Sequence, residues 1–392
     1  MKTQIVLGSF FGDEGKGATV QWLCGQAISN DLNPVVTRFS GGPQAGHRII
    51  KDGTEHVSSS FGSGVLLGVP TILNQNVMID PISMKIEYDA LRSKGIMPKL
   101  YINSLCRVIS PYDVLANIHD KKNLEDGSCG KGVFQTYKRC HDSCCDNNEA
   151  WEEEATISFA INNPGMFLRK AREFHNQFEE KGLERMFLDA VRWLEGFATL
   201  YGDSNPTEEF DMVIFEGSQG LLLDMECGFM PNCTPSRVGL NGITAKYLEQ
   251  AEVFMVMRPY ITRHGNGFEP LGDDTTREAF TINEPTNSDG GFQGRFKYGI
   301  FDETLLSRVF DRHHLDNFKL KHQLKFYCAL THMDCIANIY IPVLNKKNET
   351  IRMSDVEFKN FINGYFDKLY CSYRPDYDIN QFQEHRTAKL SG

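Results

Sequence analysis

The segment QIVLGSFFGDEGKG, residues 4–17, is the strongest indication of the fold. It joins a short apolar run, residues 4–7, to a glycine-rich turn, residues 12–17, and a plausible helix (ATVQWLCGQAI) follows. An apolar run without alternation is typical of a strand covered on both faces, as in a parallel sheet. Glycines let backbone N–H groups approach phosphate oxygens, and a helix N-terminus favours an anion. We therefore predict a strand that leads into a phosphate-binding loop with Lys16 as its cation.

An apolar run that ends in a polar or glycine-rich cluster occurs four more times, at residues 34–37, 212–215, 253–257 and 325–330. In open α/β sheets, ligands bind beyond the carboxyl ends of the strands, so we expect these clusters to converge on one crevice. Residues 81–206 differ, because helical periodicity dominates there. We interpret them as a mostly helical insertion that returns the loop GSCGKG, residues 127–132, to the crevice.

The predicted fold class is therefore α/β, with a mostly parallel central sheet flanked by helices. Its architecture is a P-loop-like nucleotide-binding one with a helical insertion, and we expect a single domain over residues 1–392. The length also allows the alternative of two independent domains.

Composition excludes several classes of protein. The 392 residues are 41% apolar and carry a net charge of -10, whereas a general binder of nucleic acid or anionic membranes needs a cationic face. No run approaches the roughly 18 apolar residues of a membrane span, and the first residues do not read as a signal peptide. The 11 cysteines are scattered, so reduced thiols and a cytoplasmic location are expected. The cluster CHDSCC, residues 140–145, is interpreted as a reduced surface loop, since zinc would need a second pair of ligands nearby.

The glycine-rich turn is not a Walker A loop. That pattern needs glycine where Phe10 stands and a serine or threonine where Gly17 stands. The hydroxyl ligand that usually holds Mg²⁺ is therefore missing, and Asp13 is the obvious carboxylate to replace it. The alternative is a plain glycine turn with a surface Asp–Lys pair.

Four motifs follow one another in a characteristic order: GDEGKG (12–17), GGPQAGHR (41–48), FEGSQGLLLD (215–224) and THMD (331–334). With the weaker matches LNQNVMIDP (73–81) and CSYRPD (371–376), this order resembles the adenylosuccinate synthetases over nearly the whole chain. The resemblance implies a homodimeric ligase, active in purine biosynthesis, that joins aspartate to IMP at the cost of GTP. Its product would be adenylosuccinate, formed through a 6-phosphoryl intermediate and accompanied by GDP and phosphate.

The resemblance also assigns the chemistry to particular residues. Asp13 would be the general base for purine N1 and a ligand of Mg²⁺, and the backbone carbonyl of Gly46 would be a second ligand. His47 would donate to the departing diphosphate and the forming phosphoryl group, because phosphoryl transfer depends on positioning and charge stabilisation. On composition alone, a lone histidine after glycine is more often an ordinary loop residue.

Binding residues follow from the same resemblance. GTP would contact Glu14, Gly15, Lys16, Gly17, His332, Asp334 and Ser372. IMP would contact Asp13, Gln44, Ser128, Cys129, Arg139, Gln219, Thr234 and Arg295. Aspartate would contact Phe292, Gln293, Arg295 and Lys297. The carboxylate of Asp334 suits guanine N1–H and N2–H₂, which favours GTP over ATP.

Some positions depart from the family pattern. Phe292 and Gln293 replace two threonines and Lys297 replaces an arginine, so the clamp on the amino-acid carboxylate is weaker and another amine donor stays open. The arginine that crosses the dimer interface has no clean counterpart, and either Lys138 or Arg139 would serve. One branch of the family uses dGMP and usually replaces the loop aspartate, so the intact Asp13 favours IMP. The alternatives are (d)GMP as acceptor, or a nucleotide-binding regulator without turnover.

Overall fold

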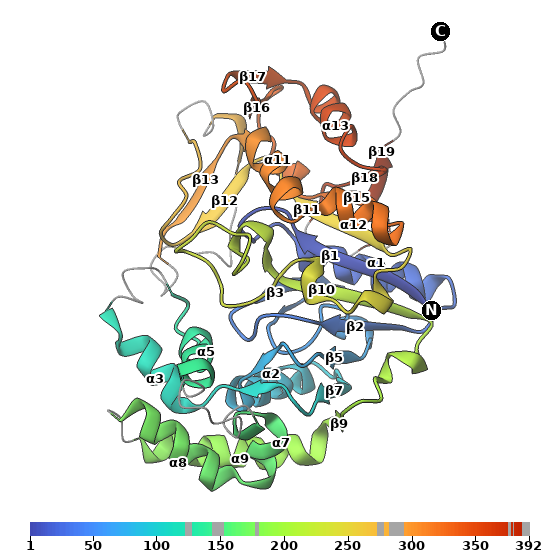
Figure 1. Ribbon diagram of the computed structural model, residues 1–392. Helices are drawn as coiled ribbons and strands as arrows, with labels where there is room; N and C mark the ends of the chain where they lie inside the picture. Colours follow the sequence, from blue (N-terminus) through green and yellow to red (C-terminus); the bar gives the residue numbers. More distant parts are fainter. Residues whose placement is uncertain are drawn as a thin grey trace.

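A ten-stranded sheet forms the centre of the molecule (Figure 1). The computed structural model describes residues 1–121, 128–142, 153–176, 180–272, 278–281, 294–374, 378 and 380–385. Every neighbouring pair in the sheet is parallel except β18–β19. The strands, in spatial order, are β19 (Phe382–His385), β18 (Lys368–Ser372), β15 (Lys325–Leu330), β11 (Glu252–Met257), β1 (Lys2–Gly8), β10 (Met212–Gly220), β2 (Pro34–Arg38), β5 (Thr71–Leu73), β7 (Leu100–Asn103) and β9 (Thr199–Tyr201). The predicted fold class is confirmed, and the five predicted strands are the five at the centre.

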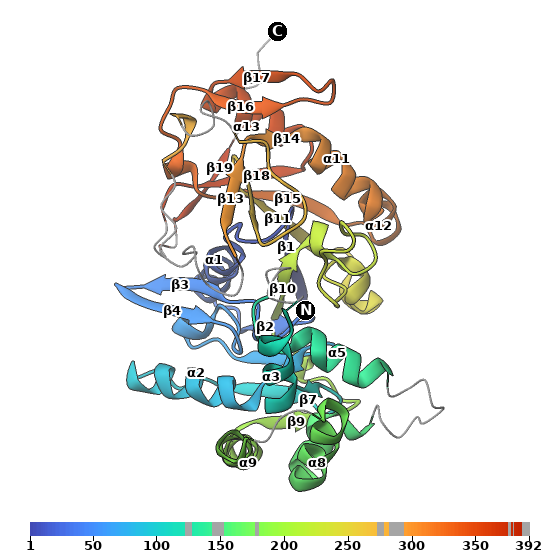
Figure 2. The same cartoon turned by 90° about the vertical axis from the view of Figure 1, so that its left-hand side faces the viewer.

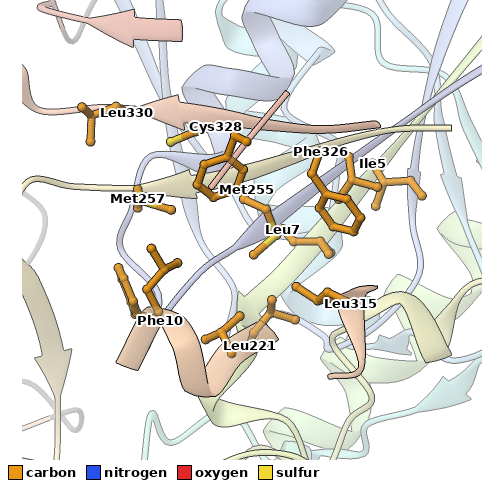
Figure 3. Close-up of a cluster of buried hydrophobic side chains, with 14 of the residues drawn as sticks. Ile5, Leu7, Phe10, Leu221, Met255, Met257, Leu315, Phe326, Cys328 and Leu330 are labelled. Carbon is orange, nitrogen blue, oxygen red and sulfur yellow. The ribbon is translucent and has the colours of Figure 1, made fainter. Parts of the chain in front are cut away.

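The central strands are buried on both faces, which explains their unbroken apolar runs. On β1, Ile5 and Leu7 pack into a core with Met255 and Leu315, the first residue of α12 (Figure 3). The alternate residue Val6 points to the opposite face and joins a second core with α1 (Lys16–Ser29). Successive side chains of a strand point to opposite faces, so one short run supplies two cores.

The stretch 81–206 is mostly helical where the structure describes it, and its helices gather at one end of the molecule (Figures 1 and 2). They are α2 (Pro81–Ser93), α3 (Pro111–His119), α5 (Val133–Asp142), α7 (Ile157–Asn162), α8 (Pro164–His175) and α9 (Lys181–Phe197). The same stretch also supplies β7 and β9, so it extends the central sheet instead of only covering it. Cys140 and His141 belong to the last turns of α5 and Cys140 is buried, so the predicted surface loop is wrong for these two residues.

The remaining elements surround the sheet. Two antiparallel pairs lie outside the central sheet: β3 (His47–Lys51) with β4 (Thr54–Ser58), and β12 (Ile261–His264) with β13 (Phe296–Gly299). The others are the pair β6 (Met78–Ile79) and β8 (Arg107–Val108), the small sheet of β14 (Phe301–Asp302), β16 (Ile341–Leu344) and β17 (Thr350–Met353), and the helices α11 (Glu303–Arg312), α12 (Leu315–His322) and α13 (Asp355–Asn363). Within the described ranges, no helix has the length and apolar character to span a membrane.

Candidate active site

A large cavity of about 1240 Å³ lies beyond the carboxyl ends of the central strands, and we call it the central pocket. It is lined by the loop after β1, by residues 43–48 after β2, by Gln219 at the end of β10 and by Thr331 after β15. The predicted convergence of the polar clusters on one crevice is therefore confirmed.

The loop between β1 and α1 is held from two neighbouring strands. The segment after β11 contributes Arg258 Nε, which donates to the carbonyl of Asp13, and Thr262 Oγ1, which donates to the carbonyl of Gly12 at 3.2 Å. From the end of β15, Thr331 Oγ1 donates to the carbonyl of Glu14 at 2.6 Å. The backbone N–H groups of the loop are thus positioned by side chains distant in sequence.

Gly15 shows why the turn needs glycine. Its φ is 91°, a conformation that L-residues rarely adopt, and a Cβ atom there would lie 3.0 Å from Cγ2 of Thr331. Any larger residue at this position would push the loop away from β15.

Inside the turn, Glu14 and Lys16 are both buried. Oε1 of Glu14 accepts from the backbone N–H groups of Phe10 at 2.6 Å and Gly12 at 3.3 Å, so this carboxylate stabilises the loop itself. Burial raises the pKa of Glu14, and the nearby Lys16 ammonium opposes that rise. Glu14 lines the central pocket, as its predicted GTP contact requires, and its Oε2 has no hydrogen-bond partner in the described structure.

His47 is the first residue of β3 and lines the central pocket. Its Nδ1 donates to Oε1 of Glu216 at 2.5 Å, while the backbone N–H of Ser63 donates to the other carboxylate oxygen at 3.0 Å. The other ring nitrogen, Nε2, has no protein partner in the described structure. Burial lowers the pKa of His47, and the carboxylate of Glu216 opposes this. Glu216 thereby fixes the tautomer and leaves Nε2 for a ligand.

Glu216 was missed by sequence reasoning, although it lies within the quoted motif FEGSQG. The available signal was a carboxylate in an otherwise apolar strand, because a buried charge needs a partner. The pKa of Glu216 is lowered, since the opposing effects of His47, Arg38 and Ser63 outweigh its burial.

Asp13 and Gly46, the two predicted magnesium ligands, both line the central pocket. The Asp13 side chain is 32% exposed and faces the central pocket, and Gly46 is exposed at the same pocket. Mg²⁺ in nucleotide sites usually takes one or two carboxylates from the protein and its other ligands from phosphates and water. The described residues hold no cluster of three metal-ligating side chains. One carboxylate beside a phosphate loop therefore fits an ion that arrives with the nucleotide.

Most other predicted contacts also line the central pocket: Gln44, Ser128, Cys129, Gln219, Thr234, His332, Asp334 and Ser372. Asn117 on α3 positions the loop at Ser128, donating to Ser128 Oγ at 2.9 Å and accepting from the N–H of Gly132 at 3.0 Å. Asn117 and the neighbouring Lys131 line the pocket as well, and sequence reasoning missed both.

His332 follows Thr331, lines the central pocket and adopts a φ of 56°. Its Nδ1 is 2.7 Å from Oγ1 of Thr331. Burial and the nearby Arg258 guanidinium hold the pKa of His332 well below its usual range, so the ring is neutral. A neutral flat ring suits stacking on a nucleobase, and the exposed carboxylate of Asp334 lies beside it.

Three predicted residues lie elsewhere. Arg139 is buried and forms a bidentate ion pair with Asp113, at 3.0 Å and 2.9 Å, so the predicted contact of Arg139 with IMP across a dimer interface is wrong. Lys297 pairs with Glu269 instead of lining the pocket, and Arg295 is exposed outside it. The predicted aspartate contacts Phe292 and Gln293 lie outside the described residues.

The adenylosuccinate synthetase family model matches residues 5–324. The chain belongs to this family. The match ends before Thr331, so it does not include the residues predicted to contact the GTP base. The family consists of ligases that form a C–N bond, and the chain is an enzyme of this type by descent.

Individual relatives are distant. The adenylosuccinate synthetase of Parabacteroides distasonis is 29% identical over 70% of this chain and 67% of its own length. That of Coxiella burnetii is 28% identical over 78% of this chain and 72% of its own length. The alignments thus span about two thirds to three quarters of these relatives.

Two solved structures share the fold. The fully ligated adenylosuccinate synthetase from Plasmodium falciparum has a TM-score of 0.72 at 17% identity and covers 98% of this chain and 100% of its own. The succinoaminodeoxyadenylate synthetase of cyanophage S-2L, bound to dGMP and dATP, has a TM-score of 0.63 at 16% identity, covering 98% of this chain and 96% of its own.

Proposed function

We propose that this protein uses GTP and Mg²⁺ to ligate aspartate to a 6-oxopurine nucleotide, IMP, giving adenylosuccinate, GDP and phosphate. The observation that carries this proposal is that Asp13, within the glycine-rich loop, and His47, at the start of β3, line one pocket. A regulator that only binds nucleotide would need neither a carboxylate at the loop nor a histidine held in one tautomer by Glu216.

The reaction has two steps. Asp13 accepts the N1 proton, so that O6 attacks the γ-phosphorus of GTP and the bond to the GDP oxygen breaks. The aspartate amine then attacks C6, and the O6-phosphoryl group leaves as phosphate. Asp13 and the carbonyl of Gly46 would hold Mg²⁺, and the bound ion would neutralise charge on the GTP phosphates.

His47 would stabilise the phosphoryl group during both steps. A proton on Nε2 makes the ring an imidazolium, which Glu216 and the substrate phosphates balance. The N–H then donates to the oxygens that gain negative charge in the transition state. The backbone N–H groups from Gly15 to Gly17 and the Lys16 ammonium would hold the GTP phosphates in line.

The amine donor would be bound by cationic side chains at or near the central pocket. Lys297 is paired with Glu269, so it would have to change partner to bind a carboxylate. Arg263 lines the central pocket and has an Nη1 without a hydrogen-bond partner in the described structure, which makes it a further candidate for this role. We also expect a homodimer in the cytoplasm, with Lys138 as the remaining candidate for the cation that crosses between subunits.

The test is a phosphate-release assay with product identification by mass spectrometry. With IMP as the acceptor, we expect phosphate only when aspartate, GTP and Mg²⁺ are also present. Release with (d)GMP but not IMP would establish the alternative acceptor, and GTP binding without any release would establish a regulator. Asp13→Asn should abolish release and leave the thermal unfolding midpoint unchanged, whereas persistent release would rule out Asp13 as the base.

A further inference from the structure

His264, at the end of β12, lies in the central pocket beside Asp13. Its Nε2 is 3.5 Å from Oδ2 of Asp13, and its ring packs on Phe296 with the centroids 4.9 Å apart. The side chain is only 15% exposed, yet neither ring nitrogen has a hydrogen-bond partner among the described residues. Buried polar atoms normally have partners, so these nitrogens are available to a ligand in the pocket.

The elements that carry His264 and His47 lie on different sides of β1. In the sheet, β1 lies between β11 and β10, and β12 follows β11 while β3 follows β2 on the β10 side. Figure 1 shows β12 and β13 above β1 and β3 below it. The loop that carries Asp13 begins at the end of β1, so the two histidines are expected to reach it from different sides.

This arrangement orients the purine, given the proposed function. If Asp13 takes the proton of N1, the two ring atoms beside N1 extend to either side of the carboxylate. The oxygen on C6 receives the phosphoryl group and so faces His47. The other neighbour of N1 is C2, which therefore faces His264.

We propose that His264 reads the substituent at C2 and shifts the acceptor preference toward 2-amino-6-oxopurine nucleotides. A 2-amino group can donate to a ring nitrogen of His264. Hypoxanthine has only C–H at this position, which leaves the nitrogen without a partner once the base has displaced water. A site with an unpartnered polar group discriminates against the ligand that fails to satisfy it.

The test uses acceptors that differ only in the 2-amino group: GMP against IMP, and dGMP against dIMP. We would measure kcat/KM for each in the wild type and in His264→Phe, which keeps a flat ring on Phe296 and removes both nitrogens. The ratio of kcat/KM, 2-amino over hypoxanthine, should fall about tenfold in the variant, as expected for one lost hydrogen bond. A ratio that stays the same or rises would overturn the proposal.

Two further variants show whether the change in the acceptor ratio is specific to the His264 ring nitrogens or follows from any change of a histidine in the pocket. His264→Gln keeps a polar group that accepts a hydrogen bond, so its ratio should lie between those of the wild type and His264→Phe. His332→Phe removes the pocket histidine at the GTP end and should change the use of GTP without changing the acceptor ratio. An equal change of the acceptor ratio in His332→Phe would contradict a reading role for His264.

A binding experiment distinguishes failure of the His264 proposal from failure of the proposed ligase function. Calorimetry of GMP and IMP without GTP measures the same preference when no turnover occurs. If no acceptor supports phosphate release, the proposed ligase function fails. The role of His264 then still requires the Kd ratio to move about tenfold in His264→Phe, and an unchanged Kd ratio overturns it.

Discussion

At the scale of single residues, the pair of His47 and Glu216 is the feature on which the proposed chemistry depends most directly. The carboxylate orients the ring, and in the proposed mechanism it would balance a proton on Nε2, although it does not line the central pocket itself. It is therefore a positioning residue, and its removal should change turnover more than binding.

Glu216→Gln tests this role. The amide still has an oxygen that can accept from Ser63, so the fold should persist, but the negative charge beside His47 is gone. We expect kcat to fall about 100-fold while KM for GTP and IMP changes less than threefold. Steady-state kinetics with a thermal melt measures both effects.

The chain offers a matched control. His56 and Glu87 form another buried pair, with His56 Nε2 and Glu87 Oε1 3.3 Å apart, and neither residue lines the central pocket. Glu87→Gln should lower stability without lowering kcat. Equal losses of kcat in both variants would show that the Glu216 effect is only structural.

At the scale of elements, the turn between β1 and α1 depends on contacts with β15. Gly15→Ala places a Cβ atom 3.0 Å from Cγ2 of Thr331 at a φ of 91°. The loop must then shift, and we expect affinity for GTP to fall at least tenfold in equilibrium binding.

Gly53→Ala is the control for backbone strain alone. Gly53 also has a positive φ, 73°, but a Cβ there meets nothing within 4 Å. This variant should lose about 1 kcal/mol of stability and keep its affinity for GTP. If both variants bind GTP equally, the close approach to Thr331 does not control the loop.

Three helices of the stretch 81–206 meet at a buried ion-pair cluster. Asp113 on α3 contacts Arg139 on α5 and His175 on α8, the latter at 2.8 Å. The Arg139 guanidinium and the bond from His175 outweigh burial, so the pKa of Asp113 lies well below its usual range. Such a carboxylate stabilises the folded state above its unfolded pKa of about 4, and this stabilisation is lost as the pH falls toward the folded pKa.

Asp113→Asn should therefore have two effects. It leaves a buried guanidinium without its charged partner, which we expect to cost about 3 kcal/mol at pH 7. It should also flatten the loss of stability between about pH 4 and pH 2, because Asn does not titrate. Denaturant unfolding at a series of pH values measures both, and an unchanged acid dependence would contradict the assignment.

The helix cluster also shows where sequence reasoning stops. Arg139 was predicted to contact IMP because the family resemblance implies an arginine that crosses the dimer interface to the nucleotide. Its actual partner, Asp113, is 26 positions away, and periodicity does not reveal which helix faces meet. His264 was missed because its approach to Asp13 depends on how the antiparallel pair β12–β13 folds over the pocket, which the sequence pattern does not reveal.

The central strands, in contrast, could be predicted because burial on both faces leaves a local signal. The strands β5, β7 and β9, at one end of the sheet, have only three or four residues each and lack such a signal, so sequence reasoning missed them. The order of polar clusters located the site as well, since every one of them follows a central strand. What it could not locate were residues such as Glu216 and Asn117 that orient other side chains.

At the scale of the whole molecule, magnesium should be required for reaction but not for folding. The described residues offer Asp13 as a side-chain ligand and no preformed cluster of three. Adding EDTA should abolish phosphate release and leave the unfolding midpoint of the nucleotide-free protein within about 1 °C. A large fall of the midpoint would reveal a structural metal and contradict this expectation.

The side chains that hold the glycine-rich loop come from two distant parts of the chain: Arg258 and Thr262 follow β11, and Thr331 follows β15. During synthesis on the ribosome, the turn at residues 12–17 emerges early, but Thr331, the last side chain that holds it, follows some three hundred residues later. If the loop binds GTP as proposed, a nascent polypeptide would bind it only after most of the chain had been translated. Incomplete chains would then not sequester GTP.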